Sequence, residues 1–351
     1  MDVWELQLPH PIQGLQRVEL CISPDFPAIP PSVFVDKKLC LIWPHVEETG
    51  KFCHGVEPSF DDYDNPIGAV RAVLEQLEVF WQNTQDADWV SAEFHRERLS
   101  YWSRFCQRQA ALDGGITPYA ARVQFFPIDD VTEGKIAVYL SGKKTKRCTL
   151  LLATTGDTDP HSLATRHGWS LGTLQRGQAL FVPLPDNALW TPQAWPTSIG
   201  HLDRLINEVT GRGQLLESWL RENSGKSRQA FMVVLVQSNV CYGYLLKAAA
   251  VSGITELQVF PIYLDRVDVT WALARDHQQK TLQRRRGVRV LVLGCGSLGS
   301  MVIEHLARAG VGQIDIVDKE GFEAANCARH VLGSDSIDLS ADSTVIWPPI
   351  P

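Results

Sequence analysis

The sequence predicts a multidomain protein that combines the α/β and α+β classes, and three observations support this prediction. The chain has 351 residues, which is enough for about two or three domains. Strands precede helices in the first segment and alternate with helices in the middle segment, which are the patterns of α+β and α/β domains. A glycine-rich turn between an apolar strand and a helix begins only at Val290, so we expect a separate domain near the carboxyl end.

Composition and charge exclude several classes of protein. Apolar residues make up 44% of the chain and charged residues 21%, as in ordinary globular proteins. The net charge of -7 argues against nucleic-acid binding, which needs a concentrated basic face, and we interpret the basic run at residues 284–286 as a solvated linker. No apolar stretch reaches the ~20 residues of a membrane span, and the start lacks the pattern of a signal peptide. We therefore expect a cytoplasmic protein without a nucleic-acid or membrane partner.

The cysteines are distributed singly, without the paired spacing that holds zinc. The sequence therefore predicts no metal site, and most of these thiols are expected to be small core residues in a reducing compartment. A functional cysteine has to be identified from its local context. The cysteines are Cys21, Cys40, Cys53, Cys106, Cys148, Cys241, Cys295 and Cys327.

The first segment, residues 1–106, is predicted to be a small sheet followed by two helices. Period-2 alternation in "VWELQL" and "RVELCI" indicates strands, and the proline-rich "SPDFPAIPPS" indicates a turn. A strand and a second apolar strand are then expected, before a polar loop that reaches Cys53. Apolar spacings of three and four from Ile67 to Phe80 predict a helix, and a second helix is expected over about residues 89–105. A cysteine on a loop beyond a sheet is placed to react rather than to pack.

This segment resembles a ubiquitin-conjugating enzyme in the order of several residues. The family has Phe-Pro-x-x-Pro-Pro-x-Val, a strand, His-Pro-Asn, and then Gly-x-x-Cys with the thioester cysteine. The matching residues here are Phe26, Pro27, Pro30, Pro31, Val33, Trp43, Pro44, His45, Gly50 and Cys53. The resemblance implies that Cys53 accepts the carboxy-terminal glycine of a ubiquitin-like protein as a thioester and passes it to an amine. His45 stands where the family places the Asn that stabilises the oxyanion, and its imidazole is a candidate for that role.

Acidic residues follow the cysteine, at Glu57, Asp61, Asp62 and Asp64. One interpretation is that they orient an incoming lysine. The other, which we favour, is that they form a solvated loop. His54 is left without an assigned role.

The middle segment, residues 107–286, is predicted to be an α/β linker domain with a structural role. "KIAVYL" and "CTLLLATT" flank the polar turn "SGKKTK" and indicate a hairpin. A helix from about His201 to Glu222, the strand "AFMVVLV", a helix near "GYLLKAAAV" and the strand "ELQVFPIYL" follow. Alternating strands and helices predict helices layered on a sheet.

The last segment, residues 287–351, is predicted to be a parallel strand-helix-strand unit. "VRVLVLG" indicates a strand, "SMVIEHLARAG" a helix and "QIDIVD" a second strand. Gly294, Gly296 and Gly299 form the turn between the first strand and the helix. Asp318 lies about 20 residues past the turn, where an acid binds a ribose hydroxyl of NAD or of ATP.

Two residues beyond Asp318 favour ATP over NAD as the ligand. Asn326 and Arg329 follow on a short loop, from which an amide and a guanidinium can reach the phosphates. The pattern resembles the ThiF-type adenylation domain of ubiquitin-activating enzymes. This resemblance implies ATP with Mg²⁺ as the cofactor, Asp318 on the ribose, and Asn326 and Arg329 on the phosphates. An NAD-dependent oxidoreductase is the less favoured alternative.

The segment departs from the ThiF-type pattern after "RHVLG". The family continues with a Gly and a phosphate-binding Lys, whereas this chain continues with "SDSIDLSADSTVIWPPIP". The family's magnesium-binding Asp and activating cysteine have no counterpart before Pro351. We therefore expect an incomplete, Rossmann-like ThiF adenylation domain that is truncated at the carboxyl end. At the amino end, the first helix of the conjugating family is missing.

Together, the segments resemble bacterial fusion proteins that attach a carboxy-terminal glycine to a target, including those of CBASS antiviral operons. The resemblance implies conjugation of a ubiquitin-like protein by a fused activating and conjugating enzyme, with adenylation inactive in this chain. The expected partner is a ubiquitin-like protein or a nucleotidyltransferase with a carboxy-terminal glycine. The adenylation domain is a candidate site for homodimer formation. A catalytically dead binding module or a truncated gene product is the alternative.

Overall fold

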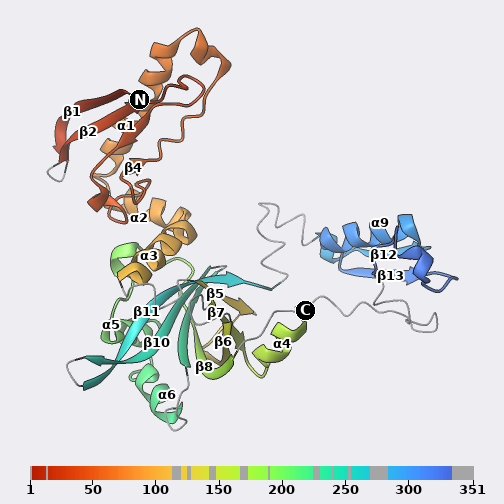
Figure 1. The fold of residues 1–351 in the computed structure, drawn as a ribbon. Helices are drawn as coiled ribbons and strands as arrows, with labels where there is room; N and C mark the ends of the chain where they lie inside the picture. The colour runs from red at the N-terminus through yellow and green to blue at the C-terminus, as the bar shows by residue number, and fades with distance from the viewer. Residues whose placement is uncertain are drawn as a thin grey trace. The chain divides into compact units, whose positions relative to one another are not determined.

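The structure is a computed structural model, and it divides into two compact units (Figure 1). The first unit comprises Met1–Arg122 and Pro127–Asp265, and the second comprises Val123–Phe126 and Arg266–Pro351. The residues that the structure describes are 2–12, 15–112, 120–124, 128–141, 148–166, 173–188, 190–223, 230–238, 240–251, 254–268 and 284–333.

The amino-terminal region of the first unit, residues 2–112, is an antiparallel sheet followed by three helices. Neighbouring strands follow chain order, so β1 and β4 are the two edges of the sheet. The strands predicted at "VWELQL" and "RVELCI", the strand predicted after the proline-rich turn and the helix predicted after Pro66 are confirmed. The strands are β1 (Asp2–Ile12), β2 (Leu15–Ile22), β3 (Ser32–Phe34) and β4 (Lys51–Phe52), and the helices are α1 (Pro66–Asn83), α2 (Ala87–Arg96) and α3 (Arg98–Leu112).

Helix α1 begins at a capping residue, and it buries one apolar stripe. The Asn65 side chain accepts a hydrogen bond from the N–H of Gly68 (3.0 Å), and proline occupies the first helical position, where its missing N–H costs nothing. The prediction of a single helix over residues 89–105 is wrong, because α2 ends at Arg96, Glu97 is its C-cap, and α3 begins at Arg98. The buried stripe of α1 consists of Ala69, Val73, Leu77, Phe80 and Trp81.

The second apolar strand expected at "LCLIW" is also wrong. The chain instead makes the short 3-10 helix η1 (Lys37–Leu39), a left-handed residue at Leu41 (φ 65°) and an isolated bridge between Cys40 and Trp43. Cys40 and Trp43 are both buried. The apolar run therefore contributes buried side chains to the core without forming a strand. An apolar run of this length does not by itself specify a strand.

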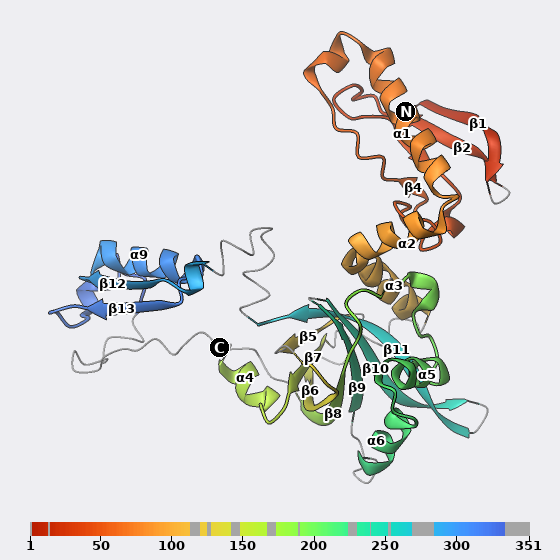
Figure 2. The same cartoon turned by 180° about the vertical axis from the view of Figure 1, so that it is seen from behind.

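The middle region is a closed barrel of seven strands in the order β10-β11-β5-β7-β6-β8-β9. Its strands pair antiparallel in the hairpins β6-β7, β9-β10 and β10-β11, and β8 pairs parallel with β9. Figure 2 shows α5 and α6 beside one side of the barrel, with α4 at another side. The strands are β5 (Ala120–Gln124), β6 (Thr132–Ser141), β7 (Cys148–Thr155), β8 (Thr173–Pro183), β9 (Ala230–Gln237), β10 (Val240–Val251) and β11 (Ile254–Arg266), and the helices are α4 (Pro160–Arg166), α5 (Ile199–Thr210) and α6 (Leu215–Asn223).

The barrel corrects the prediction of an α/β linker domain built of layers. The segment "GYLLKAAAV", predicted as a helix, lies within strand β10, which pairs with β9 on one side and β11 on the other. The helix predicted from His201 to Glu222 is divided at Gly211 (φ 66°) into α5 and α6. The predicted hairpin is confirmed as β6 and β7, whereas its turn at residues 142–147 lies outside the described residues.

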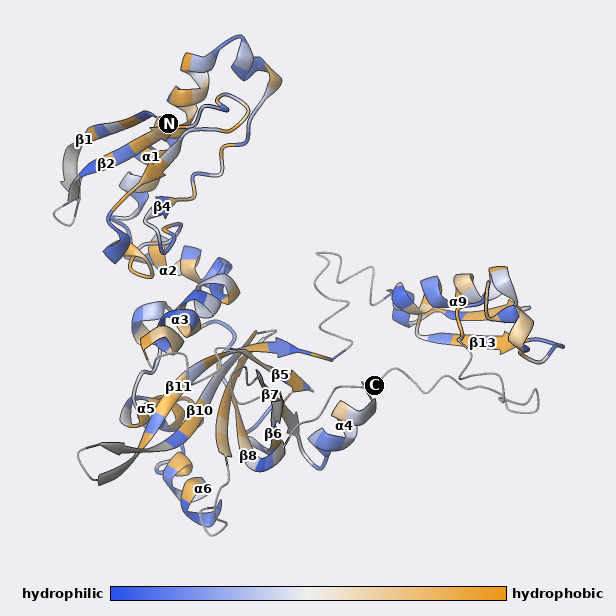
Figure 3. Cartoon of the chain, viewed as in Figure 1, coloured by the Kyte–Doolittle hydropathy of each residue, from blue (hydrophilic) through white to orange (hydrophobic). Residues whose placement is uncertain are grey.

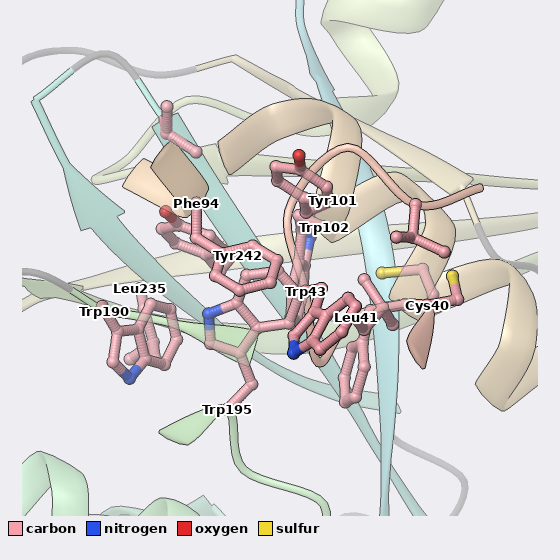
Figure 4. Packing of buried hydrophobic residues seen from close by; sticks show 14 of the residues in the cluster. Cys40, Leu41, Trp43, Phe94, Tyr101, Trp102, Trp190, Trp195, Leu235 and Tyr242 are labelled. Atoms are coloured by element: carbon pink, nitrogen blue, oxygen red, sulfur yellow. The ribbon is translucent and has the colours of Figure 1, made fainter. Parts of the chain in front are cut away.

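One apolar core joins the amino-terminal region to the barrel (Figure 4). Trp102 of α3 is fully buried, and its indole N–H donates to the carbonyl oxygen of Ile262 in β11 at 3.3 Å. Its rings pack edge-on against those of Trp195 and Tyr242, at centroid distances of 5.1 Å each. Figure 3 shows hydrophobic segments along the barrel strands. The two regions therefore share one hydrophobic core and are not independent domains joined by a linker.

The second unit contains the predicted parallel strand-helix-strand motif. Strand β12 (Arg289–Leu293) pairs in parallel with β13 (Gln313–Val317), and helix α9 (Ser297–Arg308) connects them. The short 3-10 helix η4 (Ala324–Asn326) follows β13. Across the described residues of both units, no helix is long and apolar enough to cross a lipid bilayer.

Candidate functional site

Cys53 is displayed at the edge of the amino-terminal sheet. It follows β4 directly, its side chain is exposed, and its N–H donates to the carbonyl oxygen of His45 at 2.8 Å. The turn before it requires glycine, because Gly50 has φ +86° and a Cβ there would lie 2.3 Å from the carbonyl oxygen of Val35. The sequence thus places an exposed thiol on a loop whose two sides are fixed by backbone contacts.

The structure brings His45 and Cys53 together through the backbone. His45 adopts a left-handed conformation (φ 59°), and its N–H donates to the hydroxyl of Tyr101 at 2.8 Å. Its imidazole points to another partner, because Nε2 lies 3.1 Å from Oε2 of Glu93 on α2. Burial raises the pKa of Tyr101, so this phenol stays protonated. Its hydroxyl holds the backbone of the loop at His45.

The pairing with Glu93 restricts what the His45 imidazole can do. Glu93 is 5% exposed and also contacts Arg96, so the structure holds its carboxylate between two donors. With Nε2–H given to Glu93, Nδ1 of His45 has no hydrogen-bond partner among the described residues. Nδ1 donates a hydrogen bond only in the imidazolium form, because neutral imidazole carries one N–H. An oxyanion contact from His45 therefore requires either that form or rotation away from Glu93.

Sequence reasoning missed Glu93 and Tyr101 as members of this site. They are 48 and 56 residues from His45 along the chain, so no local motif connects them. One signal in the sequence could have indicated Glu93. It stands next to Phe94 on the apolar face of its helix, and that buried face carries no other acidic residue. A buried carboxylate needs partners, and His45 and Arg96 are those partners.

His54 has a structural role beside the candidate nucleophile. Its Nδ1 accepts a hydrogen bond from the N–H of Val56 at 3.0 Å, and its Nε2 therefore donates to the carbonyl oxygen of Pro31 at 3.0 Å. The imidazole thus ties the loop after Cys53 to the proline-rich turn. Burial, more than the nearby charge of Lys51, lowers the pKa of His54 below its usual 6.5.

We expect this tie to weaken in acid. Since folding lowers the pKa of His54, the unfolded chain binds its proton more readily, and the contribution of His54 to stability is present above about pH 6.5 and lost as the pH falls below it. Protonation also removes the acceptor for the Val56 N–H. An NMR titration of the imidazole tests this, with His54→Gln identifying the resonance. An apparent pKa at or above 6.5 would contradict the expectation.

The described acidic residues after Cys53 are held in a short ordered turn. The 3-10 helix η2 (Phe60–Tyr63) is closed by a capping box, in which the N–H of Ser59 donates to Oδ2 of Asp62 at 2.7 Å. Glu57, Asp61 and Asp64 are exposed. None of the three forms an ion pair within the described part of the chain. All three are therefore open to solvent within this chain, and their exposure does not decide between the two interpretations.

The three glycines of the motif between β12 and α9 have three different local roles. Gly294 has φ +87° and its N–H donates to the carbonyl oxygen of Val317 at 2.8 Å, which fixes the turn to β13. A Cβ on Gly299 would lie 1.9 Å from the carbonyl oxygen of Gly294, so this position packs the helix against the turn. A Cβ on Gly296 meets nothing within 4 Å. Gly296 is also the N-cap of α9, and no side chain caps the helix there. Uncapped amides at the N-terminus of a helix are the groups that bind phosphate in other proteins.

Asp318 lies beside this turn. Its Oδ2 accepts the N–H of Cys295 at 2.5 Å and its Oδ1 accepts the N–H of Glu320 at 2.9 Å. These backbone hydrogen bonds lower the pKa of Asp318, so the carboxylate is charged. Its present contacts position the glycine turn, and a ribose hydroxyl would have to share its oxygens with these amides.

His330, which sequence reasoning missed, joins the segment of Asn326 and Arg329 to the turn. Its Nδ1 accepts the N–H of Leu332 at 3.0 Å and its Nε2 therefore donates to the carbonyl oxygen of Cys295 at 2.5 Å. Asn326 ends η4 and is half-buried, whereas Arg329 is exposed. The structure thus gathers the glycine turn, Asp318 and the Asn326–Arg329 segment at one end of the β12-β13 pair. In the part of the chain that is described, no group of three or more His, Cys, Asp or Glu residues is arranged to hold a metal ion.

Comparisons with known proteins match the two segments that contain these residues. Residues 9–110 match prokaryotic E2 family B, and residues 267–338 match the ThiF family. The Bos taurus protein named adenylyltransferase and sulfurtransferase MOCS3 is 44% identical over 54 residues, which are 15% of this chain and 12% of the relative. The Saccharomyces cerevisiae protein named adenylyltransferase and sulfurtransferase UBA4 is 49% identical over 51 residues, which are 14% of this chain and 12% of the relative. The predicted combination of an E2-like and a ThiF-like segment in one chain is confirmed.

Proposed function

We propose that this chain carries the carboxy-terminal acyl group of a ubiquitin-like protein as a thioester on Cys53 and transfers it to an amine. One observation supports this most directly. Of the seven cysteines whose side chains are described, Cys53 is the exposed one, and it lies within the segment that matches prokaryotic E2 family B. A thiol needs solvent access to exchange acyl groups.

The chemistry requires two acyl transfers. In the first, the Cys53 sulfur attacks an activated carboxy-terminal glycine, a C–S bond forms and the activating group leaves. In the second, an amine attacks the thioester carbonyl, a C–N bond forms, the C–S bond breaks, and the proton of the amine is lost as the Cys53 thiolate departs. His45 is the side chain that we propose for contact with the tetrahedral oxyanion, and Glu93 positions it.

The partner follows from the same proposal. We propose a ubiquitin-like protein, or a nucleotidyltransferase with a carboxy-terminal glycine, as the donor of the acyl group. A bacterial antiviral setting of the CBASS type, cytoplasmic location and homodimer formation through the ThiF-like segment are parts of the same proposal. The names of the MOCS3 and UBA4 relatives support adenylyl chemistry as the activity from which the ThiF-like segment descends.

The ThiF-like segment fits the phosphates of ATP only in part. The open space at Gly296, the first amides of α9 and the Arg329 guanidinium suit phosphate oxygens, and Asp318 suits a ribose hydroxyl. When bound, ATP with Mg²⁺ would supply an adenylyl group to a carboxylate. However, residues 334–351 contain no Lys to meet the triphosphate. We therefore propose no adenylation step for this chain.

We expect the chain by itself to show no ATP–pyrophosphate exchange with a modifier that ends in glycine. Without a lysine in residues 334–351, the Arg329 guanidinium is the one cation of this segment proposed for the triphosphate, and it compensates only part of its charge. The assay measures the incorporation of labelled pyrophosphate into ATP, and a complete activating enzyme with the same modifier is the positive control. Exchange above background that disappears with Asp318→Ala would overturn this part of the proposal.

The thioester is tested by supplying activated modifier from a complete activating enzyme. The expected result is an adduct on this chain that dithiothreitol removes. The adduct is absent from Cys53→Ala and from reactions without ATP. If the chain binds the modifier but forms no adduct, it is a binding module, and the proposed transferase activity is wrong.

A further inference from the structure

Three large apolar side chains are displayed just after Cys53. Phe60 is 94% exposed, Tyr63 is 62% exposed and Ile67 is 73% exposed. Exposed apolar residues scattered singly need no explanation, but a group of them marks an interaction site. These three residues lie within eight positions of one another in the sequence, and we call them the Phe60–Ile67 patch.

The patch is held by ordered backbone on both sides. The capping box of Ser59 and Asp62 closes η2, and in a 3-10 helix residues i and i+3 lie on the same side. Phe60 and Tyr63 therefore project together. Asn65 then caps α1, whose first turn carries Ile67. The exposure of these side chains is thus a property of a fixed scaffold.

The surroundings of the patch are acidic. Residues 54–65 contain four carboxylates and no Lys or Arg. Asp62 is used by the capping box, whereas Glu57, Asp61 and Asp64 are exposed and free of ion pairs within the described residues. Aromatic faces beside carboxylates complement long basic side chains, which offer a cation and an aliphatic stem together. The charge of this surface would repel an acidic partner.

We infer that the Phe60–Ile67 patch docks a basic segment of the acceptor polypeptide, the chain whose amine attacks the thioester on Cys53. This inference rests on the proposed function. Phe60 is seven residues from Cys53, and seven residues of fully extended chain span at most about 25 Å. An acceptor lysine at Cys53 therefore places residues on the same acceptor segment within reach of the patch. The patch selects the acceptor and takes no part in bond making.

The test separates docking of the acceptor from formation of the thioester. Cys53 is loaded without any activating enzyme, by thiol exchange with a synthetic peptide thioester that ends in Gly-Gly. Discharge is then measured with three nucleophiles: a peptide with one lysine between arginines, the same peptide with glutamates in place of the arginines, and hydroxylamine. The first two probe docking, and the third probes the reactivity of the thioester itself.

The expected result is a selective defect. Phe60→Ala/Tyr63→Ala slows discharge to the arginine-flanked peptide about tenfold, as expected for the loss of two cation–π contacts, and leaves hydroxylamine discharge unchanged. Asp61→Asn/Asp64→Asn slows discharge to the same peptide and reduces its dependence on salt. Trp4→Ala is the matched control, because Trp4 is 58% exposed and lies on β1, at the sheet edge opposite β4. It is expected to discharge like the original chain.

Three outcomes would overturn the inference. One is equal discharge to the arginine-flanked and glutamate-flanked peptides. Another is a normal rate in both double variants. The third is slower loading of Phe60→Ala/Tyr63→Ala from the Gly-Gly thioester, which would mean that the patch binds the donor instead. Failure of the proposed function looks different, because the chain would then accept no modifier from an activating enzyme although chemical loading and discharge proceed.

Discussion

Trp102→Ala lowers the free energy of unfolding of the first unit by about 3–5 kcal/mol, the range for removing a fully buried large aromatic side chain. Trp102 is 0% exposed and lies on α3, where this helix packs against the barrel. Its removal takes away ring contacts with Trp195 and Tyr242 and the hydrogen bond to the carbonyl of Ile262. Urea unfolding followed by circular dichroism and by fluorescence measures the change.

The same experiment tests whether the amino-terminal region and the barrel unfold together. Because one core joins them, both signals are expected to shift in one transition. Trp4→Ala is the control, since it removes the same side chain from an exposed position. A change below about 1 kcal/mol, or two separate transitions with only one of them shifted, would contradict the shared core.

Gly299→Ala disrupts the start of α9 in the second unit. The added Cβ would lie 1.9 Å from the backbone oxygen of Gly294, and no flexible side chain is there to give way. The helix and the turn must separate, at a cost of about 1–3 kcal/mol or more. Hydrogen exchange measures the effect directly, as faster exchange of the amides of β12 and α9.

Gly296→Ala is the matched control for this change. A methyl group at Gly296 meets nothing within 4 Å, so the exchange rates of β12 and α9 are expected to stay as they are. The two variants add the same atom three residues apart in one glycine motif. Equal effects on exchange would show that Gly299 has no packing role, and would contradict the geometry of the turn.

Elements with strong local signals were predictable from the sequence. Helix α1 has a cap, a first-turn proline and a clear apolar stripe, and the strand-helix-strand motif has a glycine turn between two apolar strands. The segment of β10 was not predictable, because an apolar run of this kind suits a strand or a buried helix equally. Its pairing with β9 and β11 decides the outcome. The closure of the barrel depends on the same long-range pairing.

In the candidate sites too, residues within local motifs were predictable, whereas residues that only folding brings together were not. Cys53 and the three glycines belong to compact motifs. The structure places Cys53 after β4 and Gly294 and Gly296 in the turn as expected, whereas Gly299 lies in the first turn of α9. Glu93 and His330 contact residues 48 and 35 positions away, and no spacing rule connects them. Both are histidine pairings that orient a loop, and only the folded chain brings such partners together.

The most direct test of the account is to locate the modifier on the loaded chain. The chain is incubated with a complete activating enzyme, a modifier that ends in glycine and ATP, and is then digested under non-reducing, mildly acidic conditions. Mass spectrometry of the fragments identifies the cysteine that carries the acyl group. We expect one adduct, on the fragment with Cys53, that dithiothreitol removes. An adduct on Cys295 or Cys327, the half-buried thiols of the ThiF-like segment, or the absence of any adduct, would contradict it.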